Sequence, residues 1–332
     1  MKPPLAGLRV LDLSRSLAGP FATMRLADMG ADVLKIEPPG GDETRGWGPP
    51  FVDGVSTYFL SINRNKRLRR LNVKTEIEEL RRLVRRADVL VENFRPGTLP
   101  FEPVRANRKL IHCTIAGYRR FRPAYDAILQ AESGLMDLTG PPDGPPYKVG
   151  ITLVDEVAGL TAVEAILAAL HRGRGCHLQV PLLDSIVSFF TYRAQEFLST
   201  GRRPRRLGNL HPNLTPYEPL PARDGCVMVG VANEGQWERF CKALDLDSSR
   251  YPTNAKRIRN RARVRRWIES ATRKLRAPEL LRLLERAEVP CGRVRSIAEV
   301  LRDRSLLVRA GRHRMVAHPV HELARNRNWF ES

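Results

Sequence analysis

The stretch from Leu8 to Pro38, LRVLDLSRSLAGPFATMRLADMGADVLKIEP, decides the fold class of this chain. It begins with a near-continuous apolar run, LRVLDLS, and ends with a second one, DVLKIEP. Between the two runs, Pro20 is suited to the start of a helix and Gly30 to its end. Two apolar strands joined by a helix predict a βαβ unit, in which a parallel sheet is covered on both faces.

The same alternation continues along the first two hundred residues. Strands are expected at DVLVENF (88–94) and KLIHCTIAG (109–117), and a helix over 124–140. This pattern predicts an α/β fold with a Rossmann-like, parallel-sheet large domain over 1–200. The segment 201–225 is rich in Pro, Gly, Asn and Arg and is expected to be a linker, followed by a smaller α+β domain over 226–307.

The composition is that of a globular protein in a reducing compartment. Apolar residues make up 42% of the 332 residues and charged residues 28%, which excludes a disordered chain. Five scattered cysteines show no C-x-x-C spacing, which argues against a zinc site or a disulfide framework. No apolar run is long enough to cross a bilayer. We therefore expect a cytoplasmic protein with no metal and no membrane partner.

The net charge of +20 admits three explanations. The basic residues could form a nucleic-acid surface, serve a polyanionic small molecule, or lie on arginine-rich solvated faces. They are spread along the whole chain, and their densest cluster, RIRNRARVRRW (257–267), has the spacing of an amphipathic helix. Aromatic residues, the usual stacking platforms for single strands, are only 7%. We expect no nucleic-acid partner.

Ligands of parallel α/β sheets bind at the carboxyl ends of strands, beside helix N-termini. Four segments fall there: SRSLAGP, EPPGGDETRGWG, ENFRPG, and Asp155 in GITLVDEVAGL (150–160). None contains the G-x-G-x-x-G of a dinucleotide site. Asp155 stands before an apolar helix and has two possible roles. It could be the helix N-cap, which the residues alone favour, or a nucleophilic carboxylate kept ionised by the helix dipole.

Together these segments resemble the family III CoA-transferases, the superfamily of formyl-CoA transferase, carnitine CoA-transferase and α-methylacyl-CoA racemase. The similar stretches run in family order from near residue 5 to near residue 300, and include ADVLVENFRPG, YDAILQAESGLMDLTGPPDGPP and VGITLVDEVAGLTAVEAILAALHRGRG. The resemblance implies an enzyme that moves coenzyme A (CoA) between carboxylic acids. Its substrates are an acyl-CoA and a carboxylic acid, with no permanently bound cofactor. It also implies a homodimer of interlocked rings, with a C-terminal return, 308–332, completing the large domain.

The resemblance also assigns roles to residues. Asp155 matches the family's nucleophile, whose carboxylate attacks the acyl-CoA thioester and passes through a mixed anhydride to an aspartyl-CoA thioester. Racemase relatives place a basic His where this chain has Tyr125, a poor base near neutral pH, which favours transferase activity. The expected CoA contacts are Leu17, Ala18, Leu71, Asn72, Val73, Lys74, Asn93, Phe94, Arg95, Ala124, Tyr125 and Asp126.

The chain departs from the family pattern in four places. The stretches between Gly97 and Lys109 and between Gly117 and Tyr125 are shortened, HRGRGCHLQV (171–180) lacks residues from the usual turn, and the return segment is brief. These departures leave two alternatives to a CoA-transferase. One is a non-catalytic homologue that still binds CoA. The other, less favoured, is a 2-methylacyl-CoA racemase.

Overall fold

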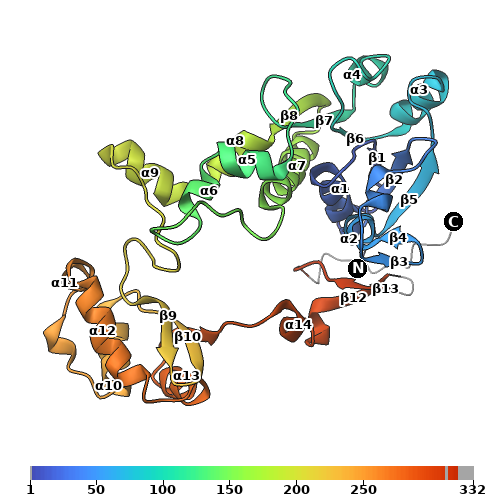
Figure 1. Cartoon of the computed structure of the whole chain (residues 1–332). Helices are drawn as coiled ribbons and strands as arrows, with labels where there is room; N and C mark the ends of the chain where they lie inside the picture. Colours follow the sequence, from blue (N-terminus) through green and yellow to red (C-terminus); the bar gives the residue numbers. More distant parts are fainter. Residues whose placement is uncertain (1, 311–312, 321–332) are drawn as a thin grey trace. The chain divides into compact units, whose positions relative to one another are not determined.

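The computed structural model describes residues 2–310 and 313–320. The chain divides into two compact units (Figure 1). Unit 1 comprises Met1–Met136, Lys148–Pro204 and the chain from Asp303 onward, and unit 2 comprises Asp137–Tyr147 and Arg205–Arg302. Each unit has its own hydrophobic core.

Unit 1 is built on a six-stranded sheet with the order β5-β2-β1-β6-β7-β8. Every neighbouring pair is parallel. From β1 the chain moves outward on one side to β2 and then β5. It then crosses to the other side of β1 and moves outward through β6, β7 and β8. A topological switch point therefore lies between β1 and β6. The predicted α/β class is confirmed. The strands are β1 (Arg9–Asp12), β2 (Asp32–Glu37), β5 (Lys66–Arg70), β6 (Val89–Glu92), β7 (Ile111–Ala116) and β8 (Cys176–Pro181).

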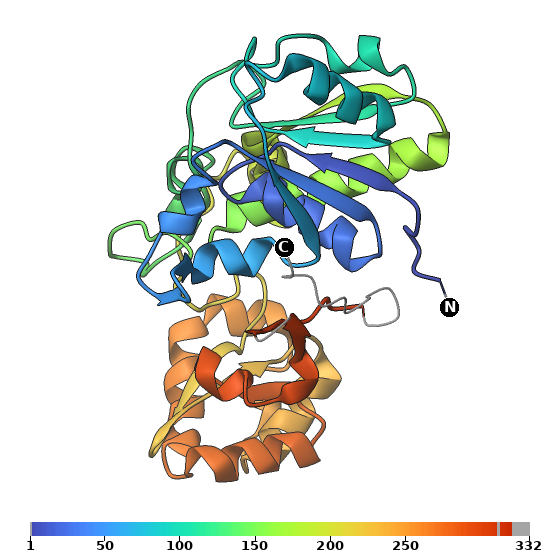
Figure 2. The ribbon, with the colours of Figure 1, turned by 90° about the vertical axis from the view of Figure 1, so that its right-hand side faces the viewer.

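Helices cover both faces of this sheet, because successive strand residues point to opposite sides. Val10 packs in the core beneath α1 (Ala18–Asp28) and α7 (Leu153–Arg172), whereas Leu11 packs in the core beneath α3 (Ile77–Arg86). In Figure 2 the strands lie between α3 above and α1 and α7 below. The other elements of unit 1 are β3 (Phe51–Val52), β4 (Val55–Ser56), α2 (Thr57–Ile62), α4 (Pro103–Ala106), α5 (Asp126–Glu132), α6 (Leu135–Leu138), α8 (Leu182–Ser188), α9 (Thr191–Thr200), β12 (Leu307–Ala310), β13 (His313–Val316) and the 3-10 turns η1 (Glu43–Gly46) and η3 (Arg304–Leu306).

Close packing of α7 on α1 depends on Gly159. A Cβ at this position would lie 2.8 Å from the carbonyl oxygen of Ala18 and 2.8 Å from the ring of Phe21. Only glycine permits so short an approach without displacing a neighbour. Gly159 therefore brings the first turns of α7, which carry Asp155, against the start of α1.

Unit 2 is a smaller α+β unit with an antiparallel sheet of order β11-β10-β9. Its core gathers Trp237, Phe240, Leu280 and Leu284. Its elements are β9 (Tyr217–Ala222), β10 (Gly225–Gly230), α10 (Glu234–Ala243), η2 (Ser248–Arg250), α11 (Asn254–Arg259), α12 (Arg261–Thr272), α13 (Ala277–Arg286), β11 (Cys291–Arg293) and α14 (Ile297–Val300).

Three sequence expectations need adjustment. The expected linker 201–225 contains β9, which pairs with β10 along its whole length. The expected helix over 124–140 is two short helices, α5 and α6, because the chain breaks at Gly134 with φ +90°. Of the expected return segment 308–332, the structure describes residues within the β12–β13 hairpin and just beyond it. Residues 311–312 and 321–332 lie outside the described part.

Candidate active site

Asp155 lies in the first turn of α7, but it is not the N-cap. The helix begins at Leu153 and Thr152 occupies the cap position, without a side-chain hydrogen bond. The capping oxygen comes from another segment. Asp126, the first residue of α5, accepts a hydrogen bond from Val154 N at 2.8 Å and a longer one from Asp155 N at 3.4 Å. The N-cap interpretation of Asp155 is therefore wrong, and Asp126 satisfies the amide groups instead.

The carboxylate of Asp126 is buried and fixed by a second side chain. Gln130 donates from Nε2 to Asp126 Oδ2 at 2.6 Å and to the carbonyl oxygen of Ile151 at 3.1 Å. Its Oε1 accepts a hydrogen bond from Val149 N at 2.8 Å. These contacts join α5 to the segment that leads into α7. They hold the backbone of Asp155 at a defined place.

The pKa of Asp155 is raised to about 7. The carboxyl group is half-buried, and this burial is the largest cause of the raised pKa. The negative charges of Asp126 and Glu156 raise the pKa further. The expectation from the sequence, that the helix dipole keeps this group ionised, is wrong. Desolvation and two neighbouring acids outweigh a dipole effect that is modest within the first turn. Near neutral pH the group exchanges readily between its two forms, a property concentrated at functional sites.

Tyr58, which lies outside the expected set of site residues, interacts electrostatically with this carboxyl group. Burial raises the pKa of the Tyr58 hydroxyl, and the negative charges of Asp155 and Asp126 raise it further. The Trp47 ring meets the Tyr58 ring edge-on, with centroids 5.1 Å apart. Trp47 stands in the segment EPPGGDETRGWG after β2, one of the four expected ligand positions. A tryptophan in a loop at the carboxyl end of a strand is the sequence feature that could have indicated Trp47 as a site residue.

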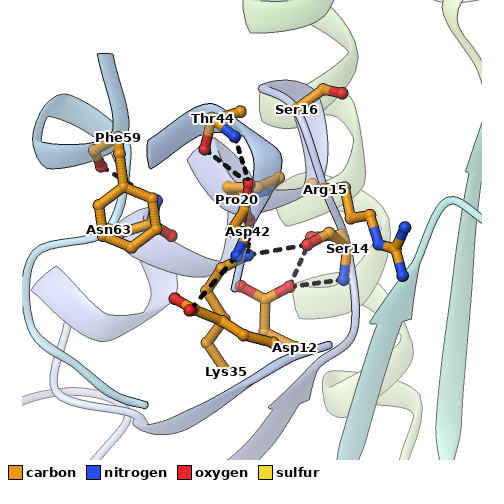
Figure 3. Close-up of polar contacts among 12 residues, drawn as sticks. Asp12, Ser14, Arg15, Ser16, Pro20, Lys35, Asp42, Thr44, Phe59 and Asn63 are labelled. Carbon is orange, nitrogen blue, oxygen red and sulfur yellow. Dashed lines mark hydrogen bonds and ion pairs between the residues drawn. The ribbon is translucent and has the colours of Figure 1, made fainter. Parts of the chain in front are cut away.

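A buried ionic network supports the loop after β1 (Figure 3). The Asp12 carboxylate lies 3.0 Å from Lys66 Nζ and accepts a hydrogen bond from Ser14 N at 2.9 Å. Lys35 Nζ donates to the carbonyl oxygen of Ser14 at 2.8 Å and pairs with Asp42 at 2.9 Å. Burial alone would raise the pKa of Asp12, but the charges of Lys66 and Lys35 hold it well below its ordinary value. The network fixes the loop that leads into α1.

A hollow of about 230 Å³ opens where β1, β2, β5 and β6 end. It brings together five of the residues expected to contact CoA, which are Leu71, Asn72, Val73, Lys74 and Phe94. Arg15 also lines it, with its guanidinium 5.5 Å from the centre of the Phe94 ring. Asn93 holds Arg15 in place, since its side chain accepts from Arg15 N at 2.9 Å and donates to Arg15 O at 2.8 Å. Sequence reasoning missed Arg15, although it lies within SRSLAGP.

Comparison with known proteins decides the family. The sequence profile of CoA-transferase family III matches residues 5–331. The chain belongs to CoA-transferase family III. It is 43% identical to the succinate–glutarate CoA-transferase of Agrobacterium fabrum, over 91% of this chain and 82% of that protein. It is 39% identical to the succinyl-CoA:mesaconate CoA-transferase of Haloarcula marismortui, over 90% and 82%. A crystal structure of a CAIB/BAIF family protein from Brucella suis superposes with a TM-score of 0.84 at 36% identity, covering 96% and 93%.

The chain is therefore an enzyme of the CoA-transferase class, and CoA thioesters are the substrates of that class. Among the residues that the structure describes, no three His, Cys, Asp or Glu side chains are placed to hold a metal ion. No helix in the described ranges is both long and apolar enough to cross a membrane.

The remaining residues expected to contact CoA do not line the hollow. Leu17 and Ala18 are both buried in this family III enzyme. Arg95 lies with its guanidinium 5.9 Å from the centre of the Phe121 ring. Ala124, Tyr125 and Asp126 belong to the α5 side, beside α7. Tyr125 is 66% exposed, whereas the carboxylate of Asp126 accepts a hydrogen bond from the backbone at the start of α7. Five of the expected contacts thus lie at the hollow, and Ala124, Tyr125 and Asp126 lie on the α5 side, whereas Leu17, Ala18, Asn93 and Arg95 belong to neither group.

Proposed function

We propose that this enzyme transfers CoA from succinyl-CoA to a small dicarboxylic acid through an aspartyl-CoA thioester on Asp155. The observation that carries the mechanism is the Asp155 carboxyl group, half-buried at the start of α7 with a pKa of about 7. The substrate class is supported by the relatives, whose names specify succinyl, glutarate and mesaconate groups.

The proposed reaction needs no redox partner and no water. An Asp155 oxygen attacks the succinyl thioester carbonyl, the C–S bond breaks, and a succinyl–aspartyl anhydride and CoA thiolate result. The thiolate attacks the aspartyl carbonyl, which releases succinate and leaves Asp155 as the CoA thioester. The acceptor carboxylate then attacks that thioester, giving a new anhydride and CoA thiolate. The thiolate finally attacks the acceptor's carbonyl, which gives the product acyl-CoA and restores Asp155.

The described residues support each part of this scheme. Asp126 and Gln130 hold the backbone of the nucleophile, so that it is oriented before substrate binds. A pKa of about 7 leaves a sizeable ionised fraction at neutral pH, and partial desolvation keeps that carboxylate reactive. At the hollow, Lys74 and Arg15 are suitable partners for the phosphates of CoA. The net charge of +20 favours the approach of polyanionic CoA and dicarboxylates.

We also infer that the working form is a homodimer, as the family resemblance implies. The support is α9, a ten-residue helix with no buried residue. Phe197 is 52% exposed and Leu198 73%, and Phe189 just before the helix is 55% exposed. Clustered apolar side chains of this size usually mark a protein–protein contact. Light scattering should give the mass of a dimer, and Phe197→Asp with Leu198→Asp should shift it to that of a monomer.

The proposed transfer is tested by following conversion of succinyl-CoA to glutaryl-CoA or mesaconyl-CoA by the purified full chain. Asp155→Asn is nearly isosteric and should lower kcat by at least about 1000-fold, because the nucleophile is lost. Glu164→Gln, an exposed acid on the same helix, is the matched control and should keep wild-type activity. Wild-type rates in Asp155→Asn would overturn the mechanism, and transfer to neither acid would overturn the substrate class.

A further inference from the structure

A second and larger hollow, of about 790 Å³, lies on the sheet face that carries α3. α3 packs against β1 and α4, and the strands at the near edge of the sheet, β2 and β5, extend beyond it. The residues that line this hollow come from β1, β2, β5 and α3, and none of them lines the hollow at Leu71–Lys74. The larger hollow is therefore a separate feature. We call it the α3 cleft.

The floor of the α3 cleft is apolar. Leu11 and Leu34 contribute from β1 and β2, and Leu83 and Ala87 from α3 and the residue after it. Leu68 also borders the hollow, but it is paired with Lys35, so its side chain points to the other face of the sheet. A concave apolar surface of several hundred cubic ångströms is typical of sites for small organic molecules.

The rim of the α3 cleft is strongly cationic. Five arginines line it, Arg9, Arg67, Arg69, Arg82 and Arg86. Lys66 lines it as well, but its Nζ is bound to the buried Asp12 and adds no charge to the rim.

Three carboxylates offset this charge only in part. Arg9 pairs with Asp88 at 2.9 Å and Arg67 pairs with Asp32 at 2.8 Å. Arg69 and Arg82 share one carboxylate, that of Glu79, at 2.5 and 2.6 Å. Within residues 2–310 and 313–320, Arg86 has no carboxylate at ion-pair distance. The rim therefore keeps a surplus of positive charge beside an apolar floor.

We propose that the α3 cleft binds an apolar carboxylate, a molecule with an alkyl or aryl body and one anionic head. The body would lie on Leu34, Leu83 and Ala87, which removes apolar surface from water. The head would meet Arg86, whose planar guanidinium can donate two parallel hydrogen bonds to a carboxylate. A neutral molecule lacks the head, and a cation would be repelled by the arginine rim. This proposal does not depend on the CoA-transfer proposal.

The probe is 1-anilinonaphthalene-8-sulfonate, an aromatic anion whose fluorescence rises in apolar sites, titrated into the folded full chain with excess CoA present. Saturable binding near one equivalent is expected, with displacement by decanoate and much weaker displacement by decanol. Arg86→Gln should weaken decanoate binding by at least about 10-fold, the equivalent of one hydrogen bond to a charged group. Arg85→Gln changes the same charge in the same helical turn outside the cleft, and should have no effect. Leu83→Glu, at a half-buried position on the cleft side of α3, should abolish binding.

Three results would overturn the proposal. The first is the absence of saturable binding. The second is equal weakening by Arg85→Gln and Arg86→Gln, which would indicate general charge attraction. The third is probe binding that survives Leu83→Glu, which would place the probe elsewhere. Circular dichroism of each variant confirms that it is folded. The CoA-transfer rate of Leu83→Glu, measured separately, shows whether any change at the cleft reaches the Asp155 site.

Discussion

Asp126 Oδ1 lies 3.4 Å from the backbone nitrogen of Asp155, so the group that caps α7 is also a negative charge beside the proposed nucleophile. The two residues are 29 positions apart in the sequence. One carboxylate thus both positions Asp155 and raises its pKa.

Asp126→Asn separates these two roles. The amide keeps an oxygen that can accept from Val154 N but removes the negative charge. The pKa of Asp155 should therefore fall below about 7, and the acidic limb of the pH profile of kcat/KM should move to lower pH. Asp126→Ala, which also removes the cap, should cost about 1 kcal/mol of unfolding free energy as well. An unchanged acidic limb in Asp126→Asn would show that Asp126 does not act on Asp155 electrostatically.

Asp155→Asn should inactivate the enzyme and stabilise it at alkaline pH. The folded pKa of Asp155, about 7, lies above the unfolded value near 4. Between these values the folded chain holds a proton that the unfolded chain has lost, so stability falls as pH rises and the full penalty applies above pH 7. The variant should gain about 1–3 kcal/mol over wild type in urea unfolding at pH 8 and almost nothing at pH 4. Equal gains at both pH values would contradict the raised pKa.

Gly159→Ala tests the contact that brings α7 against α1. The new Cβ would meet the carbonyl oxygen of Ala18 and the Phe21 ring at 2.8 Å, and backbone must move to relieve this. A loss of about 1–3 kcal/mol in unfolding free energy is expected, together with a lower kcat. Gly235→Ala is the matched control, since Gly235 is also helical and a Cβ there would lie 3.6 Å from its nearest neighbour, an ordinary contact distance. That control should be neutral or slightly stabilising.

Lys66→Met tests the buried network beneath the loop after β1. The substitution leaves Asp12 charged and without its main partner. It should lower the free energy of unfolding by about 3–5 kcal/mol. Adding Asp12→Asn removes the stranded charge while keeping an acceptor for Ser14 N, so the double variant should recover part of the loss. Additive losses in a urea-unfolding cycle would show that the two charges do not interact.

The interior of the sheet could be predicted from the sequence, whereas its edges could not. β1, β2, β6 and β7 are continuous apolar runs because both of their faces are covered. β5, with the sequence KRLRR, and β8, with CHLQVP, escaped prediction. Both are edge strands with exposed side chains, so solvent and not the core sets their pattern.

Part of the candidate site follows strand ends that could be predicted. Phe94 follows β6, a strand that the apolar pattern predicts, and lies at the hollow. Leu71–Lys74 follow β5, which the pattern does not predict, and only the family resemblance assigned them. The capping of α7 by Asp126 and the raised pKa of Asp155 arise from burial and from a distant residue. Neither the capping nor the raised pKa can be predicted from the spacing of residues near Asp155 in the sequence.

Covalent catalysis by Asp155 implies an activated carbonyl that hydroxylamine can trap. The full chain is incubated with succinyl-CoA and hydroxylamine, then digested and mapped by mass spectrometry. We expect a hydroxamate on Asp155 that requires succinyl-CoA and is absent from Asp155→Asn. A folded, active enzyme that transfers CoA but forms its hydroxamate on another residue, or on none, would contradict covalent catalysis by Asp155.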